Sequence, residues 1–386
     1  MRVLWVHSGS WKSHAAISYI GVHNAWSFAQ CDVETHLLIP DHGEDSATDI
    51  DLQDFYGLKA DPRLHIHRIR LKKQWWHLRH PYFAYAERFA RALLKNDRLL
   101  VLSREQRLLP VLARLSRQPG CVCLFETHNL YINQSWREAS DISRGDRKRS
   151  ALERVYLPRL QGIVAITAEQ FKLYHKALPT INGLALPLGV KLLTLPDEGE
   201  CEARRARRTV AYIGHLLQSK GIPGMLSVAG DLASHGIRLA LFGGSQVEAD
   251  KLCGDAGLSA SAVSCTPFLP PAQMFRALAE TASIGIVALE DTFYNRHLTC
   301  PVKALDFLAL GMPVVASDLP STREVLGDAA LYFLPGDTQQ MSSAINRLLG
   351  DEKLYAELSR HANARAAALS WEARAKAILI YASTTA

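Results

Sequence analysis

The chain has 386 residues, of which 48% are hydrophobic and 21% charged, and its formal net charge is +6. This length is too great for one ordinary hydrophobic core and predicts two domains of somewhat under about 200 residues each. No apolar run reaches the roughly 18 to 20 residues that a membrane-spanning helix needs. The start, MRVLWVHSGS, is typical of a strand and not of a secretory signal, so we predict a cytoplasmic protein.

Strands alternate with helices through the first half of the chain. Apolar patterns predict strands at 3–6, 33–39, 64–71, 99–102, 122–125 and 163–166, and helices at 15–30, 81–95, 105–117, 146–161 and 168–176. Residues 41–62 are acidic and polar, which predicts a loop, and alternating His and Arg in 64–71 predict a strand near a sheet edge. The alternation indicates a parallel sheet covered by helices on both faces.

Residues 59–117 carry the excess of positive charge in the chain. They contain fifteen Lys and Arg against four Asp and Glu, and Trp75 and Trp76 lie close to Lys72, Lys73 and Arg79. Basic and aromatic side chains together suit an anionic membrane surface, which makes the inner face of the membrane a second predicted location; a solvated basic face is the alternative. No nucleic-acid-binding motif accompanies the charge, so we predict no nucleic-acid partner. Failure to co-sediment with anionic vesicles at low salt would count against membrane binding.

Polar residues follow the strand predicted at 122–125, in the sequence Glu126-Thr127-His128-Asn129. Sites of α/β proteins are built at the carboxyl ends of parallel strands. His128 is therefore a candidate site residue, and a purely structural histidine is the alternative.

Residues 187–208 interrupt the alternation with prolines, glycines and the run ARRARR. We predict an N-terminal domain over 1–187, a linker over 188–208, a second domain over 209–369 and a final helix over 370–386. In the second domain, strands are predicted at 209–213, 237–242, 263–268 and 284–289, and residues 337–369 are predicted to be helical with an interruption near 350–351.

Residues 295–324 are predicted to form a loop, a helix, a short strand and a second helix. Pro301 suits a first helical turn, apolar residues follow at helical spacing up to Gly311, and the β-branched pair at 314–315 predicts a buried strand. Polar residues at 317–321 are candidate caps of the second helix, which we expect to end at Glu324. A helix N-terminus beside a strand end binds phosphate groups, so this stretch predicts a nucleotide site.

Turns at Gly214, at Gly243-Gly244 and before Pro301 end three strands of the second domain, and the first two contain glycine. Glycine lets a backbone approach a ligand closely, and the following amides can bind phosphate. Lys220 follows the first turn and is placed to neutralise a diphosphate. The GxxxxGK[ST] and GxGxxG signatures are both absent, which argues against a P-loop NTPase and a dinucleotide oxidoreductase.

Seven cysteines occur without a CxxC pair or a matching Cys/His cluster. This pattern predicts no disulfide framework and no structural zinc site, and we expect most of the cysteines to be small buried residues. We predict no metal site and no tightly bound cofactor.

The sequences YIGHLLQSKG at 212–221, FGG at 242–244 and PVKALDFLALGMPVVASDLPSTREVL at 301–326 resemble the donor-binding half of retaining GT-B glycosyltransferases of the GT4 family, the glycosyl transferases group 1. The resemblance extends over most of residues 209–345. It implies two Rossmann-like, doubly wound α/β domains facing an interdomain cleft. The C-terminal domain would bind a UDP- or GDP-sugar as co-substrate. The N-terminal domain would bind the acceptor, which would be a glycan, a lipid-linked sugar or a small molecule, and the final helix would cross back to it.

The resemblance also implies roles for individual residues. Asp306 matches the acidic residue that binds the ribose hydroxyls. Lys220 matches the lysine that neutralises the diphosphate. His128 matches the histidine near the transferred sugar. The predicted catalytic residues are thus His128 and Lys220, and the predicted donor-binding residues are Gly214, His215, Lys220, Gly243, Gly244, Asn295, Thr299, Cys300, Lys303 and Asp306.

Two positions depart from the family pattern. Leu298 stands where the first acid of an acidic pair is usual, and His215 stands where an arginine is usual. We predict that the donor sugar is contacted instead by Asn295, Arg296 and Lys303. A subset of the family has the same Pro and Lys before the acidic helix, so the departures do not predict a loss of activity.

These residues predict transfer of a hexose-type sugar from a nucleotide diphosphate to an acceptor hydroxyl, with retention of configuration by resemblance alone. Breaking the anomeric C–O bond leaves negative charge on the diphosphate, and a lysine with helix-end amides can stabilise that charge without a metal. The alternatives are a nucleotide-sugar epimerase of the same architecture and a catalytically weak GT-B-like binding subunit. Incubation of donor without acceptor identifies an epimerase, because it changes the sugar itself.

Overall fold

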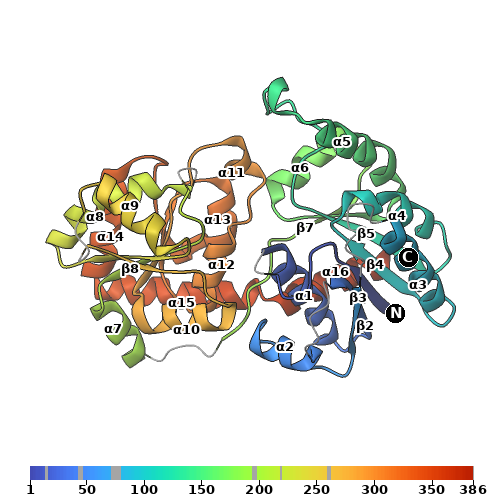
Figure 1. The fold of residues 1–386 in the computed structure, drawn as a ribbon, viewed down its shortest axis with the longest axis horizontal. Helices are drawn as coiled ribbons and strands as arrows, with labels where there is room; N and C mark the ends of the chain where they lie inside the picture. Colours follow the sequence, from blue (N-terminus) through green and yellow to red (C-terminus); the bar gives the residue numbers. More distant parts are fainter. Residues whose placement is uncertain are drawn as a thin grey trace. The chain divides into compact units, whose positions relative to one another are not determined.

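The structure, a computed structural model, describes residues 1–13, 16–41, 47–70, 80–193, 198–217, 220–258 and 262–385. The chain divides into two compact units (Figure 1). The N-terminal unit consists of Met1–Pro187 together with Trp371–Ala386, and the C-terminal unit consists of Leu188–Ser370. Each unit contains one parallel sheet packed between helices.

The sheet of the N-terminal unit has the strand order β3-β2-β1-β4-β5-β6-β7, and its strands pair in parallel. The described strands are β1 (Arg2–Val6), β2 (Thr35–Asp41), β3 (Leu64–Arg70), β4 (Leu99–Ser103), β5 (Cys121–Thr127), β6 (Gly162–Ala165) and β7 (Gly183–Ala185). The helices are α1 (Ala16–Ala29), α2 (Thr48–Asp54), α3 (His80–Leu94), α4 (Leu109–Leu115), α5 (Arg144–Tyr156), α6 (Ala168–Ala177) and α16 (Trp371–Thr384). The inner strands are continuous apolar runs because helices cover both faces of a parallel sheet.

The last helix of the chain belongs to the N-terminal unit. Helix α16 packs against α1, and its residues Ala375, Ile378 and Ala382 are buried in the same core as Trp5 of β1. The apolar side chains of α16 therefore stabilise the unit that the first half of the chain forms.

The sheet of the C-terminal unit has the strand order β10-β9-β8-β11-β12-β13, again with parallel pairing. The described strands are β8 (Thr209–Ile213), β9 (Arg238–Phe242), β10 (Val263–Thr266), β11 (Ile284–Val287), β12 (Val314–Ser317) and β13 (Ala330–Phe333). The helices are α7 (Glu198–Ala206), α8 (Ile222–Ser234), α9 (Gln246–Asp255), α10 (Pro271–Thr281), α11 (Phe293–His297), α12 (Val302–Ala309), α13 (Pro320–Leu326), α14 (Thr338–Gly350) and α15 (Glu352–Ala368).

Both sheets reverse their strand order beside their first strand, between β1 and β4 and between β8 and β11. Ligands of doubly wound sheets bind at the carboxyl edge of such a reversal. The predicted doubly wound α/β architecture is confirmed, and β3 is an edge strand as the His and Arg alternation indicated.

The structure corrects several predicted elements. Residues 41–62, predicted as a loop, contain α2, whose acidic first turn suits a helix N-terminus and whose Leu52 is buried in the core. Residues 295–297, predicted as a loop, belong to α11, because Thr292 caps that short helix by accepting from the amide of Asn295. The short strands β7 and β13 were not predicted, and the helix predicted at 105–117 is a 3-10 turn (Gln106–Leu108) followed by α4.

Residues 188–208, predicted as a linker, contain α7 within their described part. Arg204 of α7 is buried and donates hydrogen bonds to the carbonyl oxygens of Leu310 and Gly311 at 2.8 and 3.2 Å. These contacts attach α7 to the C-terminal unit, which accounts for a helix in a segment without clear apolar periodicity.

All seven cysteines are free thiols. Only Cys121, Cys123 and Cys300 are buried, so the prediction that most of them are buried is wrong. The other four lie at partly exposed positions. No helix in the described part of the chain is long and apolar enough to cross a membrane.

Residues 71–79, the centre of the basic segment, lie outside the described residues, including the lysines, tryptophans and arginine on which membrane binding was predicted. In the described part of the segment, several arginines form ion pairs, among them Arg68 with Asp41 and Arg107 with Glu105. These pairs neutralise a part of the positive charge, and both membrane association and the alternative of a solvated basic face stay predictions.

Candidate functional site

The turns after β8 and β9 touch through glycine residues. Gly214 has a φ of +128° and Gly243 a φ of +134°, and a Cβ on Gly243 would lie 2.3 Å from the carbonyl oxygen of Gly214. A Cβ on Gly244, with a φ of +73°, would lie 2.7 Å from Leu216. Only glycine fits this close approach, so the structure brings together three of the glycines predicted from the sequence.

Lys303, in the first turn of α12, lies beside the turn after β8. Its Nζ is buried without a hydrogen-bond partner and lies 3.9 Å from the centroid of the Tyr212 ring. A Cβ on Gly214 would lie 3.8 Å from the same Nζ. The ring attracts the ammonium group but accepts no conventional hydrogen bond, so the donors of Lys303 are unused beside the glycine turn.

Asp306 and Lys220 complete a charged cluster around Lys303. The three-residue spacing places Lys303 and Asp306 on one face of α12. Burial, reinforced by the charge of Lys220, lowers the pKa of Lys303 to about 7, and Asp306 opposes this shift. Burial raises the pKa of Asp306 to about 7, and Lys303 opposes that shift. We call Gly214, Lys220, Gly243, Lys303 and Asp306 the β8 site; it lies where the strand order reverses between β8 and β11.

An exposed aromatic ring borders the β8 site. Phe268 follows β10, is 51% exposed, and its ring centroid lies 4.9 Å from that of the His215 ring. Its Cε1 would lie 3.1 Å from a Cβ on Gly243. The sequence pattern did not single out Phe268, because the strand predicted at 263–268 included it, whereas β10 ends at Thr266. The only available signal was an aromatic residue in a proline-rich stretch, directly after Pro267 and two residues before Pro270.

Asn295 and Leu298 have structural roles within the C-terminal unit. Asn295 is 4% exposed and its Nδ2 donates to the carbonyl oxygen of Glu290 at 2.9 Å. Leu298 is fully buried at the end of α11. Leu298 is thus a core residue, which explains its apolar character at a position where a carboxylate was expected. Arg296 forms an exposed ion pair with Asp291.

The side chains of Thr299 and Cys300 also have local partners. Thr299 Oγ1 donates to the carbonyl oxygen of Tyr294 at 3.2 Å. Cys300 is buried, and its Sγ accepts from the amide of Leu188 at 3.3 Å. These two residues precede Pro301, the N-cap of α12, so their backbone lies near the N-terminus of the helix that carries Lys303 and Asp306.

In the N-terminal unit, His128 is held by a chain of buried charged groups. Its Nε2 lies 2.5 Å from Oε1 of Glu126, and Oε2 of Glu126 accepts from Nη2 of Arg374 at 2.9 Å. Arg374, on α16, also donates to Asn24 Oδ1 at 2.7 Å and to the carbonyl oxygen of Pro187 at 2.9 Å. Glu126 and Arg374 are 0% and 4% exposed. The last helix therefore fixes the carboxylate that holds His128.

The electrostatics of this chain of groups keep the imidazole neutral. Burial, together with Arg104, lowers the pKa of His128 to about 4, although Glu126 favours the cation. Burial alone would raise the pKa of Glu126, but Arg374 and His128 outweigh it and lower the pKa to about 2. At neutral pH, Nε2–H of His128 therefore donates to the Glu126 carboxylate and Nδ1 is the acceptor of the ring.

Glu126 and Arg374 were not predicted as functional residues. Glu126 lies within β5, which extends to Thr127 instead of ending at 125. Arg374 occupies a position in the final helix that no local pattern distinguishes, and its partner Glu126 is far away in the sequence.

Two carboxylates of α2, Asp49 and Asp51, have the D-x-D spacing that occurs in metal sites. Asp51 is buried, accepts from Trp11 Nε1 at 2.8 Å and pairs with Lys12 at 3.3 Å. These contacts assign Asp51 to the core of the N-terminal unit. No group of three or more His, Cys, Asp or Glu in the described ranges is arranged to hold a metal ion.

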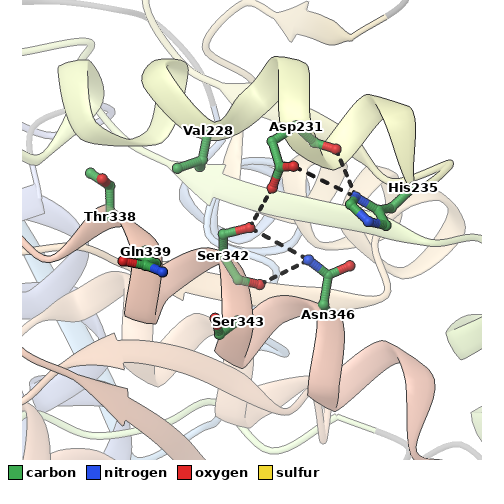
Figure 2. Close-up of a pocket in the computed structure, with 8 residues that line it drawn as sticks. All are labelled: Val228, Asp231, His235, Thr338, Gln339, Ser342, Ser343 and Asn346. Atoms are coloured by element: carbon green, nitrogen blue, oxygen red, sulfur yellow. Dashed lines mark hydrogen bonds and ion pairs between the residues drawn. The ribbon is translucent and has the colours of Figure 1, made fainter.

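Several hollows open on the C-terminal unit. Figure 2 shows one of about 490 Å³ between α8 and α14, where Ser342 Oγ donates to Asp231 at 2.8 Å and Asn346 donates to the carbonyl oxygen of Ser342 at 3.1 Å. It contains none of the β8-site residues. A smaller hollow of about 250 Å³ lies beside the N-terminus of α8 and is lined by Gly221, which follows Lys220 directly, and by Ser317.

Two Rossmann-like α/β units with parallel, doubly wound sheets define a protein of the GT-B fold. Residues 207–351, which include the β8 site, match the family model of the glycosyl transferases group 1. No curated protein sequence matches the chain.

Solved structures with the same fold extend over the whole chain. The sucrose-phosphate synthase of Thermosynechococcus elongatus is 17% identical with a TM-score of 0.69, and the match covers 100% of this chain and 99% of that one. Anabaena HepE in complex with UDP is 14% identical with a TM-score of 0.65 and 100% of each chain covered. A mutant of S. aureus TarM in complex with fondaparinux, alpha-GlcNAc-glycerol and UDP is 10% identical with a TM-score of 0.70 and 99% of each chain covered. The chain is similar to these proteins in fold.

Proposed function

We propose that the protein is a glycosyltransferase that moves a hexose-type sugar from a nucleoside diphosphate to an acceptor hydroxyl, with retention of configuration and without a metal. The observation that carries this proposal is the convergence of Lys220, Lys303 and Asp306 on the glycine turns of β8 and β9. The match of residues 207–351 to the glycosyl transferases group 1 supports it. HepE, which has the same fold, is described in complexes with UDP and with UDP-glucose.

In this proposal the β8 site binds the donor, a UDP- or GDP-sugar. Lys220 and Lys303 neutralise the diphosphate, the Asp306 carboxyl group binds the ribose hydroxyls, and the backbone at 299–300 contacts phosphate or sugar. As the anomeric C–O bond breaks, negative charge grows on the diphosphate oxygens. Preorganised cations at that position lower the barrier because they need no reorganisation when the charge develops.

The N-terminal unit binds the acceptor in this proposal, as a glycan, a lipid-linked sugar or a small molecule. The neutral imidazole of His128 supports it, because its Nδ1 is an acceptor for a hydroxyl group while Glu126 fixes the ring. Glycan and GlcNAc-glycerol ligands in the TarM complex are consistent with a hydroxyl-bearing acceptor.

The function is tested by incubating the protein with UDP- and GDP-hexoses and a panel of acceptors while the release of nucleoside diphosphate is measured. We expect release that depends on both donor and acceptor, and stabilisation of the fold by the donor in a thermal shift assay. Binding without turnover over a broad panel would support the binding subunit instead. Conversion of the sugar without acceptor would support the epimerase, and absence of nucleotide binding would overturn the proposal.

Phe268 is expected to stack on the base of the nucleotide. Its exposed ring lies against His215 and the Gly243 turn, at the end of the site towards β10. Base–aromatic stacking contributes about 1–3 kcal/mol, so Phe268→Ala should weaken UDP binding by about tenfold or more in calorimetry. Phe268→Leu keeps the apolar volume without the ring and should weaken binding nearly as much. Unchanged dissociation constants in both variants would exclude the stacking role.

A further inference from the structure

We propose that nucleoside diphosphate binding at the β8 site is coupled to proton uptake by Lys303, which is neutral in the empty site and cationic in the loaded site. This inference rests on the proposed donor site. It assigns Lys303 a role beyond that of a permanent positive charge, because Lys303 becomes a cation when the negatively charged diphosphate binds.

The surroundings of Nζ in the empty site disfavour an ammonium ion. The atom is buried, and none of its donors has a hydrogen-bond partner. An ammonium ion removed from water without acceptors carries a large desolvation penalty, which a neutral amine avoids. The Tyr212 ring, at 3.9 Å, offsets a part of this penalty.

Among the described residues, three groups face Lys303 from the elements around it: Lys220 from the turn before α8, Asp306 from α12 and Tyr212 from β8. Lys220 disfavours a second cation nearby. Asp306 favours one, but burial raises its pKa to about 7, so near neutral pH it is itself only partly ionised. The pKa of Lys303, lowered to about 7, agrees with an amine that is mostly neutral at about pH 8.

A nucleoside diphosphate changes this balance because it brings negative charges and hydrogen-bond acceptors to the unused donors of Lys303. An opposite charge within about 4–6 Å favours the charged form of a group. As the ligand binds, one proton moves from the acid form of the buffer to Nζ: the bond between the proton and the buffer breaks, an N–H bond forms, and the buffer base remains in solution. In the loaded site, Lys303 and Lys220 both carry positive charge towards the departing diphosphate.

Titration calorimetry with UDP and GDP at about pH 8, in HEPES and in Tris, tests the coupling, because the two buffers differ in ionisation enthalpy. Since about one proton is taken up, we expect different observed enthalpies in the two buffers, and a difference that shrinks towards about pH 6, where Lys303 is already protonated. Lys303→Arg keeps a permanent cation and should bind within about tenfold of wild type without proton uptake. Lys172→Arg, an exposed lysine substitution in the N-terminal unit, is the matched control and should keep the uptake.

Equal enthalpies in both buffers for the wild type would overturn the coupling while leaving the donor site intact. Proton uptake that persists in Lys303→Arg would also overturn it, because the proton would then bind elsewhere, for example at Asp306. Failure of both UDP and GDP to bind the wild type would overturn the proposed function and this inference together.

Discussion

Replacing Lys220 with alanine is expected to lower donor turnover by about 100- to 1,000-fold, since removal of one preorganised donor to a developing negative charge has effects of this size. Lys220 lies at the β8 site, where its charge acts on Lys303, and it precedes Gly221, the N-cap of α8. Without it, Lys303 is the remaining lysine of the β8 site beside the departing diphosphate. The measurement is the rate of nucleoside diphosphate release at saturating donor and acceptor.

The matched control is Lys251→Ala, which removes an exposed lysine of α9. It should retain turnover close to wild type. Circular dichroism and thermal unfolding should show that both variants are folded. Turnover near the wild-type rate in Lys220→Ala would contradict the assignment of this lysine to the leaving diphosphate.

Replacing Arg374 with alanine is expected to reduce the free energy of unfolding by about 3–5 kcal/mol, because it leaves the Glu126 carboxylate buried without its cation. The change also leaves the side-chain oxygen of Asn24 and the carbonyl of Pro187 without their donor. Chemical denaturation measures the effect. Lys376→Ala, an exposed position of the same helix, should change stability by no more than about 0.5 kcal/mol.

The effect of Arg374→Ala should depend on pH with a definite sign. The pKa of Glu126 is about 2 in the folded protein, below its ordinary value of 4.5. The stability that its pairing contributes is therefore complete above about pH 4.5 and is lost as pH falls towards 2. The difference between wild type and variant should shrink over that window. An equal difference at neutral and acidic pH would contradict a charge-based role.

The candidate donor site was largely predictable from the sequence because its parts are local. A glycine at the end of a strand, a lysine before a helix and a carboxyl group in a helix's second turn are recognisable in short windows. Parallel strands place their carboxyl ends at one edge of a sheet, so Gly214, Gly243, Lys220 and Asp306 had to lie near one another once the strands were assigned. The structure confirms that architecture and brings these residues together.

Other features depended on contacts that no short window contains. Phe268 became part of the site border because β10 ends two residues earlier than predicted. The amide of Asn295 donates to the carbonyl oxygen of Glu290 at the start of α11, a contact that the sequence did not indicate, and its contact with the donor stays a prediction. A carboxylate was expected at position 298, but the residue there is Leu298, and the structure buries it completely.

The sequence by itself determined the two strand–helix series, the glycine turns and the charged residues of α12, because periodicity and turn chemistry act over a few residues. Tertiary structure alone decided that Nζ of Lys303 is buried against the Tyr212 ring without a hydrogen-bond partner. It also decided that Arg374 donates a hydrogen bond to the Glu126 carboxylate. Both outcomes are consequences of burial, which depends on residues distant in the chain. Burial is also what moves the pKa of Lys303 and of His128, so the protonation states on which the proposed chemistry depends follow from the fold.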